Sequence, residues 1–253
     1  MIRTTIESGV GMLTLARPER RNALTPDMLS ALAAEAQRLG TLAQAILVTG
    51  EGPAFCAGFD LDLCRDDPSG QALRLLLVGL SDAIRALREQ PCPVVMAVHG
   101  AAVAGGCALL GGSDVTVAEL GTKLGYPVAR LGISPAVSAP FLISDLAQGR
   151  VRQLQLDPGL ITASHAKEIG LVAEVASGVD ATVARGREIA NRLASNASEA
   201  MRSTRRWVQE LAAPPEAAVQ SGLATSLGLI GGIELETMLA QAWTGRTGPR
   251  GGS

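Results

Sequence analysis

Two short apolar runs, each followed by a turn that contains glycine, constrain the fold of this chain more than any other feature. Ala45–Thr49 is a β-branched apolar run closed by a glycine, and Pro93–Val98 has the same character. Their length and their flanks are typical of buried strands. Between them, Gln71–Gln90 repeats leucine and isoleucine on one helical face. This alternation of strand and helix predicts an α/β core.

The rest of the chain begins with strand-like segments and ends with helical ones. Further strands are expected at Ile2–Ile6, Met12–Ala16, Asp114–Ala118 and Val172–Val175, the first two as a hairpin. Helices are expected at Met28–Leu39, Pro135–Leu146, Ser164–Gly170, Asp180–Ser195, Ala197–Leu211 and Pro215–Trp243. Thr25 is the expected N-cap of the first of these helices, with Pro26 at its first position. We therefore expect a core over residues 1–195, a helical region over 196–244 and a disordered tail over 245–253.

Composition and charge exclude several classes of partner. The formal net charge is -2 and the isoelectric point is about 5.8, so no basic field exists for nucleic acid or an anionic membrane surface. We see no signal-peptide pattern and no apolar segment long enough to span a bilayer. The four cysteines lack CxxC spacing and histidine neighbours. We therefore expect reduced thiols in a cytoplasmic protein, with no metal site.

Two turns form the candidate site. The first, Ala54–Leu61, follows the strand at Ala45–Thr49, and the second, His99–Ala108, follows Pro93–Val98 and leads into a helix. Small residues let backbone N–H groups approach a ligand, and a helix N-terminus favours negative charge. Two N–H groups from separate turns could converge on one oxygen, as an oxyanion hole requires. The alternative is that the two turns serve packing alone. Neither turn fits the sequence fingerprint of a phosphate-binding loop.

Five blocks of this sequence resemble the enoyl-CoA hydratase/isomerase (crotonase) family. They are LARPERRNAL, AFCAGFDL, PVVMAVHGAAVAGGCALL, LGYPVARLGISPAV and IGLVAEV, in the family's order and spacing. The resemblance implies an α/β fold, with a crotonase-like ββα spiral core and a helical C-terminal region that mediates trimerisation, often as a dimer of trimers. It also implies an acyl-CoA thioester as the ligand, with no cofactor beyond the coenzyme A of the substrate.

The resemblance also implies roles for particular positions. The backbone N–H groups of Phe59 and Gly105 would hold the thioester oxygen. Asn22–Leu24 and Ala57–Leu61 would line the pocket for the adenine and pantetheine of coenzyme A. The full set of expected substrate-contacting residues is Asn22, Ala23, Leu24, Ala57, Gly58, Asp60, Leu61, Gly106, Ala108, Tyr126, Val128 and Arg130.

The chain departs from the family pattern where family hydratases carry two glutamates. Ala108 and Val128 stand at these positions, and neither can move a proton, a step worth about 10²- to 10⁴-fold in rate. Tyr126 and Arg130 are candidate substitutes, or else serve packing and an ion pair. Whether the chain is an enzyme therefore stays open. It is a hydratase/isomerase, an acyl-CoA-binding protein with weak or no hydration activity, or a crotonase with decarboxylase or thioesterase chemistry.

Other polar residues fit structural roles better than catalytic ones. Asp60 is typical of a carboxylate that orients its loop, and His99 of a hydrogen-bonding scaffold residue. His165 lies in a surface-like segment. Three arginines at positions 202, 205 and 206 repeat along a predicted helix, where they form a solvated face or contact the phosphates of coenzyme A.

Overall fold

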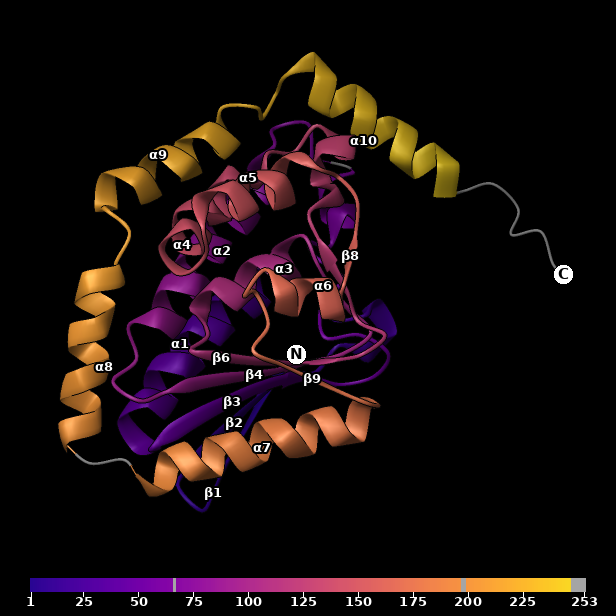
Figure 1. The fold of residues 1–253 in the computed structure, drawn as a ribbon. Coiled ribbons are helices and arrows are strands. Elements are labelled where there is room, and N and C mark those ends of the chain that lie inside the picture. The colour runs from indigo at the N-terminus through magenta and orange to yellow at the C-terminus, as the bar shows by residue number, and fades with distance from the viewer. Residues whose placement is uncertain (66, 197–198, 247–253) are drawn as a thin grey trace, which may run out of the picture.

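The core is built on a six-stranded sheet (Figure 1). The computed structural model describes residues 1–65, 67–196 and 199–246, so most of the predicted tail lies outside the described residues. The strands, in sheet order, are β1 (Ile2–Glu7), β2 (Val10–Leu15), β3 (Ala45–Gly50), β4 (Val94–Val98), β6 (Val115–Glu119) and β9 (Glu174–Ala176). The β1–β2 hairpin is antiparallel, as predicted, and the other neighbours pair in parallel.

A second, three-stranded sheet contains β5 (Ala101–Val103), β7 (Lys123–Gly125) and β8 (Ile161–Thr162). Along the chain, β4 and β5 are consecutive strands that belong to different sheets, and so are β6 and β7. This arrangement agrees with the predicted ββα spiral. The strand β5 lies within His99–Ala108, which the sequence predicted as a turn. The sequence gives no sign of β5, because three small residues carry no periodic signal and their pairing partner, β7, is distant in sequence.

Ten helices are found in the described part of the chain. They are α1 (Pro26–Leu42), α2 (Gln71–Arg88), α3 (Gly105–Ala108), α4 (Ala139–Asp145), α5 (Gln148–Leu156), α6 (Ala163–Glu168), α7 (Val179–Ser195), α8 (Glu199–Ala212), α9 (Glu216–Leu227) and α10 (Ile233–Arg246). The expected cap of α1 is present, because the Thr25 side chain accepts a hydrogen bond from the backbone N–H of Met28. The helical segment predicted at Pro215–Trp243 is two helices, since a glycine-containing turn with Gly231 at φ +81° separates them.

Helices cover both faces of the large sheet at its centre, which is why the central strands β3 and β4 are buried and almost entirely apolar. In β4, Val95 and Ala97 pack toward α7 on one face. Val94, Met96 and Val98 pack on the other face into the larger cluster, which α1 and α2 complete. Figure 1 shows α7 on one side of the sheet and α1, α2 and α3 on the other.

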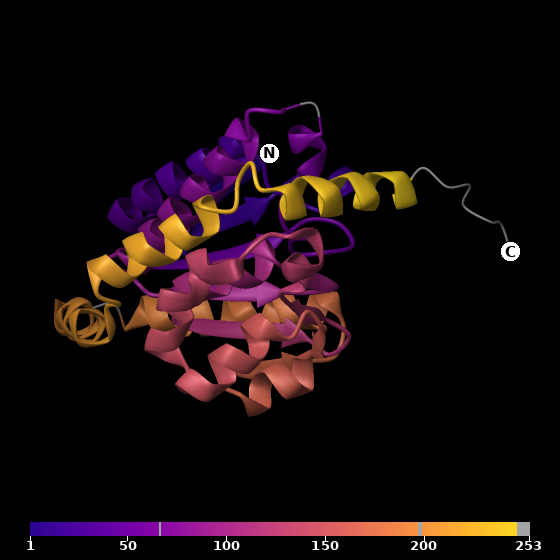
Figure 2. The ribbon, with the colours of Figure 1, turned by 90° about the horizontal axis from the view of Figure 1, so that it is seen from above.

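The C-terminal helices α8, α9 and α10 follow one another around the outside of the body (Figure 1), and α10 extends beyond it in the view from above (Figure 2). Arg205 of α8 is 8% exposed and forms an ion pair with Asp114, 2.9 Å long. On α9, the Ser226 hydroxyl accepts a hydrogen bond from the N–H of Val137 at 3.0 Å. These contacts fix the predicted helical region onto the core, and α10 ends at Arg246, three residues past the predicted end of the helix at Trp243. No helix within the described ranges is long and apolar enough to cross a bilayer.

Candidate functional site

The two predicted turns lie side by side at the carboxyl ends of β3 and β4, the edge where ligands bind in open α/β sheets. Backbone hydrogen bonds join them. The N–H of Phe55 donates to the carbonyl oxygen of His99 at 2.9 Å, and the N–H of Cys56 donates to the carbonyl oxygen of Ala101 at 2.9 Å. The N–H of Val103 donates back to Cys56 at 3.0 Å. The structure thus brings together residues that are 44 to 47 positions apart in sequence.

Glycines allow the turns to approach at main-chain distance. A Cβ placed on Gly58, whose φ is +95°, would lie 3.0 Å from the Ala104 Cβ and 3.7 Å from the nitrogen of Gly105. A Cβ on Gly106 would lie 2.4 Å from the carbonyl oxygen of Cys56. Larger side chains at these positions would force the turns apart. Glycine therefore sets the spacing of the site.

The backbone N–H groups of Phe59 and Gly105 have no hydrogen-bond acceptor within the described part of the chain. Neither N–H donates any of the hydrogen bonds found among the described residues, whereas the N–H of Asp60 donates to Leu24 and that of Ala104 donates to Gly125. Ala104 has a φ of +54°, a conformation that costs an alanine of order 1–3 kcal/mol and persists where its surroundings hold it. The helix α3 has only four residues, so its dipole is small.

Both residues line a cavity of about 190 Å³. Seven of the predicted site residues lie in its wall: Ala57, Phe59, Leu61, Gly105, Ala108, Tyr126 and Val128. The other lining residues are Leu77, Leu80, Val103, Ala104, Pro127, Leu131, Ile133, Ser134, Pro135, Val137 and Ser138. The lining contains no carboxylate, imidazole or cationic side chain, and no cluster of metal-binding side chains occurs within the described ranges.

Seven predicted site residues lie outside the wall of this cavity: Asn22, Ala23, Leu24, Gly58, Asp60, Gly106 and Arg130. Arg130 is exposed, although its neighbour Val128 lines the cavity. Both residues belong to the 3-10 helix at Pro127–Leu131, and the structure does not bring Arg130, a candidate substitute for a missing glutamate, to the wall of the cavity. Of the two candidate substitutes, the structure brings Tyr126 alone to the cavity.

Asn22 has a structural role beneath the first turn. It is fully buried, and its amide group donates to the carbonyl oxygens of Glu51 and Ala54 at 2.9 and 2.8 Å. Its side-chain oxygen accepts a hydrogen bond from the N–H of Arg17 at 2.8 Å. These bonds satisfy the polar groups of a buried amide and fix the segment between β3 and the first turn.

Asp60 also supports this turn, as the sequence predicted. It is 5% exposed and forms ion pairs with Arg17 at 2.8 Å and Arg20 at 2.9 Å. Burial acts to raise its pKa, but hydrogen bonds from the two guanidinium groups outweigh burial and lower the pKa below its usual value. Asp60 is thus an ionised carboxylate that binds two arginines, and this state makes it a poor base.

The potential nucleophiles near the cavity are held in their neutral form. Burial raises the pKa of Cys56 and of Cys107 to about 12, so both remain thiols at neutral pH. Burial raises the pKa of Tyr126 well above its usual value. The Tyr126 hydroxyl lies near Ser138 and Cys107, yet it makes no hydrogen bond of ordinary geometry within the described structure.

The two histidines match their expected structural roles. His99 is 1% exposed, and its Nε2 lies 3.0 Å from the carbonyl oxygen of Gly52. His165 is partly exposed and lies 3.0 Å from Glu168. Of the three arginines on α8, Arg205 forms a buried ion pair instead of the solvated face or phosphate contact that the sequence suggested.

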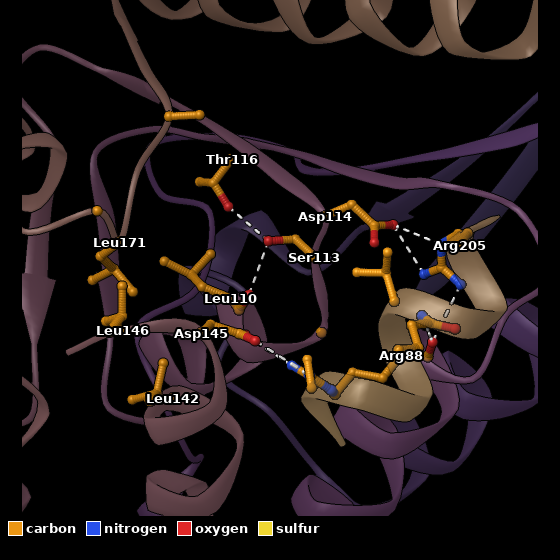
Figure 3. A pocket seen from close by; sticks show the side chains of 16 residues that line it. Arg88, Leu110, Ser113, Asp114, Thr116, Leu142, Asp145, Leu146, Leu171 and Arg205 are labelled. Atoms are coloured by element: carbon orange, nitrogen blue, oxygen red, sulfur yellow. Dashed lines mark hydrogen bonds and ion pairs between the residues drawn. The ribbon is translucent and has the colours of Figure 1, made fainter. Parts of the chain in front are cut away.

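A larger cavity of about 340 Å³ lies elsewhere, next to α8 and the start of β6 (Figure 3). Its charged side chains pair with one another, Arg88 with Asp145 at 2.8 Å and Arg205 with Asp114. Ser113 and Thr116 are also hydrogen-bonded to each other. The polar groups of this larger cavity are thus already paired with one another, and the cavity lies at the amino ends of the parallel strands. We therefore place the candidate site at the smaller cavity, which contains Phe59 and Gly105.

Sequence reasoning missed the residues that close the smaller cavity. Leu77 and Leu80 belong to the apolar face of α2, which the sequence identified as core. Ile133 and Val137 belong to the block LGISPAV, whose resemblance to the family indicated its importance but not its contacts. What makes these apolar residues part of the site is their position beside the two turns. That position is known only from the fold.

Comparisons with known proteins agree on one family. The family model described as enoyl-CoA hydratase/isomerase matches residues 5–226. The enoyl-CoA hydratase EchA19 of Mycobacterium tuberculosis is 31% identical over 84% of this chain and 85% of its own length. The 1,2-epoxyphenylacetyl-CoA isomerase of Escherichia coli is 34% identical over 67% of each chain. A crystal structure of an enoyl-CoA hydratase/isomerase from Mycobacterium paratuberculosis superposes with a TM-score of 0.84, at 25% identity over 95% of this chain and 97% of that one.

Proposed function

This chain belongs to the enoyl-CoA hydratase/isomerase (crotonase) family, and we propose that it binds acyl-CoA thioesters and polarises their carbonyl group. The thioester oxygen accepts hydrogen bonds from the N–H groups of Phe59 and Gly105. One observation carries this proposal: two turns packed against each other present unbonded amide groups at the wall of an apolar cavity.

The physical advantage of this arrangement lies in where charge develops. Addition to an acyl thioester, or its deprotonation, moves negative charge onto the carbonyl oxygen. Two fixed amides stabilise that oxygen in a site with little water, and the loss of one such donor typically costs about 2.7–4 kcal/mol. The same stabilisation serves hydration, isomerisation, decarboxylation and thioester hydrolysis.

A second candidate function follows from the lining of the cavity. Ala108 and Val128 occupy the positions of the two family glutamates, and no carboxylate replaces them among the lining residues. The polar lining side chains are Tyr126, Ser134 and Ser138. The hydroxyl of Ser134 accepts a bond from the Ala136 N–H, and that of Ser138 donates to Pro135. These observations favour a protein that binds acyl-CoA with weak or no hydration activity, or one with decarboxylase- or thioesterase-type chemistry.

Two measurements on the purified protein separate these functions. Calorimetry with butyryl-CoA and hexanoyl-CoA tests binding, and the absence of binding to either thioester contradicts the whole proposal. Loss of the conjugated thioester absorbance of crotonyl-CoA tests hydration. Binding without measurable hydration supports the second candidate. Turnover in the ordinary hydratase range contradicts it, because a proton-transfer group would then be present.

We also propose that the chain assembles as a homotrimer or a dimer of trimers and works in the cytoplasm. Exposed apolar side chains on α8, namely Trp207, Val208 and Leu211, support a contact with a second copy. Four free cysteines support a reducing compartment. Light scattering after size-exclusion chromatography tests the assembly, and a monomer at micromolar concentration contradicts it. Fractionation of the producing cells tests the location, and recovery outside the cytoplasmic fraction contradicts it.

A further inference from the structure

Phe59 belongs to the part of the cavity wall that the two turns form. A Cβ placed on Gly105 would lie 3.2 Å from Cε1 of the Phe59 ring and 3.1 Å from Cδ1 of Leu24. The ring therefore packs directly against the residue whose amide is proposed to hold the thioester oxygen. Since the ring and the other proposed amide belong to the same residue, the ring lies within a side chain's length of the thioester group.

The cavity beside this ring is small. At about 190 Å³ it falls below the range of roughly 300–1,000 Å³ that is typical of pockets for drug-sized ligands. A cavity of about 150 Å³ can hold benzene. The cavity in this protein is partly open to solvent, so by this comparison the part within its walls holds an acyl segment of about six carbons or a single phenyl ring.

The cavity walls also select for chemical character. Phe59, Leu61, Leu77, Leu80 and Leu131 present aliphatic or aromatic surface. The lining contains no cation that could pair with a charged acyl group, so burying such a group would cost its hydration without compensation. An apolar acyl group, by contrast, gains free energy from leaving water.

From these observations we propose that Phe59 is a specificity-determining residue, whose ring limits the site to short, uncharged acyl groups. This inference rests on the proposed binding of acyl-CoA. It gives Phe59 two roles. Its amide binds the thioester oxygen, and its ring limits the length of the acyl chain. Removal of the ring should open a space of about the size of benzene next to the thioester and let longer chains enter.

The test is a chain-length series with butyryl-, hexanoyl-, octanoyl- and dodecanoyl-CoA, measured by calorimetry. For the unmodified protein we expect the lowest Kd with hexanoyl-CoA and at least tenfold weaker binding of dodecanoyl-CoA. For Phe59→Ala we expect the optimum to move to octanoyl-CoA or longer. Phe59→Leu retains much of the apolar volume and should give an intermediate profile, which provides a second readout if Phe59→Ala does not fold.

A matched control removes a large apolar side chain elsewhere. Leu156→Ala acts on a residue of α5 that is 78% exposed and lies outside the cavity, and it should keep the profile of the unmodified protein. If the protein binds acyl-CoA but the folded Phe59 variants keep the same optimum, the role of the ring is contradicted while the proposed function stands. If no acyl-CoA binds to the unmodified protein, both proposals are contradicted.

Discussion

The aromatic ring of Phe59 lies against Gly105, so that a Cβ on the glycine would come within 3.2 Å of the ring. Phe59 follows β3 and Gly105 follows β5, and the two residues are 46 positions apart in a chain that folds them into one wall. This contact joins the two proposed oxygen-binding amides and the apolar cavity in a single structural unit. Substitutions that move one turn relative to the other should therefore affect both the spacing of the amides and the shape of the cavity.

Gly106 provides a direct test of how closely the turns pack. A Cβ at this position would lie 2.4 Å from the carbonyl oxygen of Cys56, a backbone atom that cannot rotate away. Gly106→Ala should lower the free energy of unfolding by about 1–3 kcal/mol or more, the typical cost of overpacking. Urea denaturation followed by circular dichroism measures this change.

The matched control for that variant is Gly149→Ala. Gly149 is exposed in α5, and a Cβ there would meet nothing within 4 Å. Alanine should raise the free energy of unfolding by up to about 1 kcal/mol, because glycine is the poorer helix former. Equal stability of the two variants would show that the turns have room to separate.

Asp60 should make the stability of the fold depend on pH. Its pKa is lowered in the folded protein by Arg20 and Arg17, so the folded state binds a proton less readily than the unfolded chain. The stabilisation is then fully present above the unfolded value of about 3.9 and is lost as pH falls through the lower folded pKa. Asp60→Asn should lower the melting temperature at neutral pH, by a difference that stays constant above about pH 5 and shrinks below about pH 4.

Asp180→Asn removes an exposed carboxylate at the start of α7 and serves as the control for loss of charge. Its melting temperature at neutral pH should fall by less than that of Asp60→Asn, because an exposed carboxylate in the first turn of a helix contributes only about 0.3–1 kcal/mol through the helix dipole. A difference between Asp60→Asn and the unmodified protein that persists undiminished at pH 3 would contradict the ion-pair account of Asp60.

The missing glutamates suggest an experiment that restores them. Ala108 and Val128 both line the cavity, and the double variant Ala108→Glu, Val128→Glu places carboxyl groups where family hydratases have them. If the rest of the cavity is intact, hydration of crotonyl-CoA should rise by about 10²- to 10⁴-fold, the usual contribution of positioned proton transfer. Absorbance of the conjugated thioester measures the rate.

The corresponding double glutamine variant has nearly the same shape but cannot transfer a proton, so its hydration rate should stay at the level of the unmodified protein. If a folded, CoA-binding double glutamate variant shows no gain over the glutamine variant, the cavity has diverged beyond these two residues.

Local patterns in the sequence predicted most of the core. The apolar runs at β3 and β4, the capped helix α1 and the leucine-rich face of α2 were all identified, because burial and helical periodicity leave a direct trace in the sequence. The short strands β5, β7 and β8 were missed, because two or three residues carry no period and their pairing depends on distant partners. The helix α5 was missed because only Val151 and Leu154 are buried in it.

The candidate site was predicted in part. Phe59, Ala108 and Val128 were found through the resemblance of their turns and blocks to a family, and they line the cavity. Arg130 could not be placed by sequence, since one turn of a 3-10 helix decides whether its side chain faces the cavity or the solvent. The contact between the ring of Phe59 and Gly105 was also beyond sequence, because it depends on the spacing of two turns.

The most direct test of the central proposal is a crystal structure of the protein with hexanoyl-CoA bound. We predict that the thioester oxygen lies about 2.7–3.1 Å from both amide nitrogens, of Phe59 and of Gly105, the distance that an oxyanion hole requires. We also predict that the hexanoyl chain lies in the apolar cavity beside the Phe59 ring. A thioester oxygen bonded to other groups, or amides that point away from it, would contradict the account.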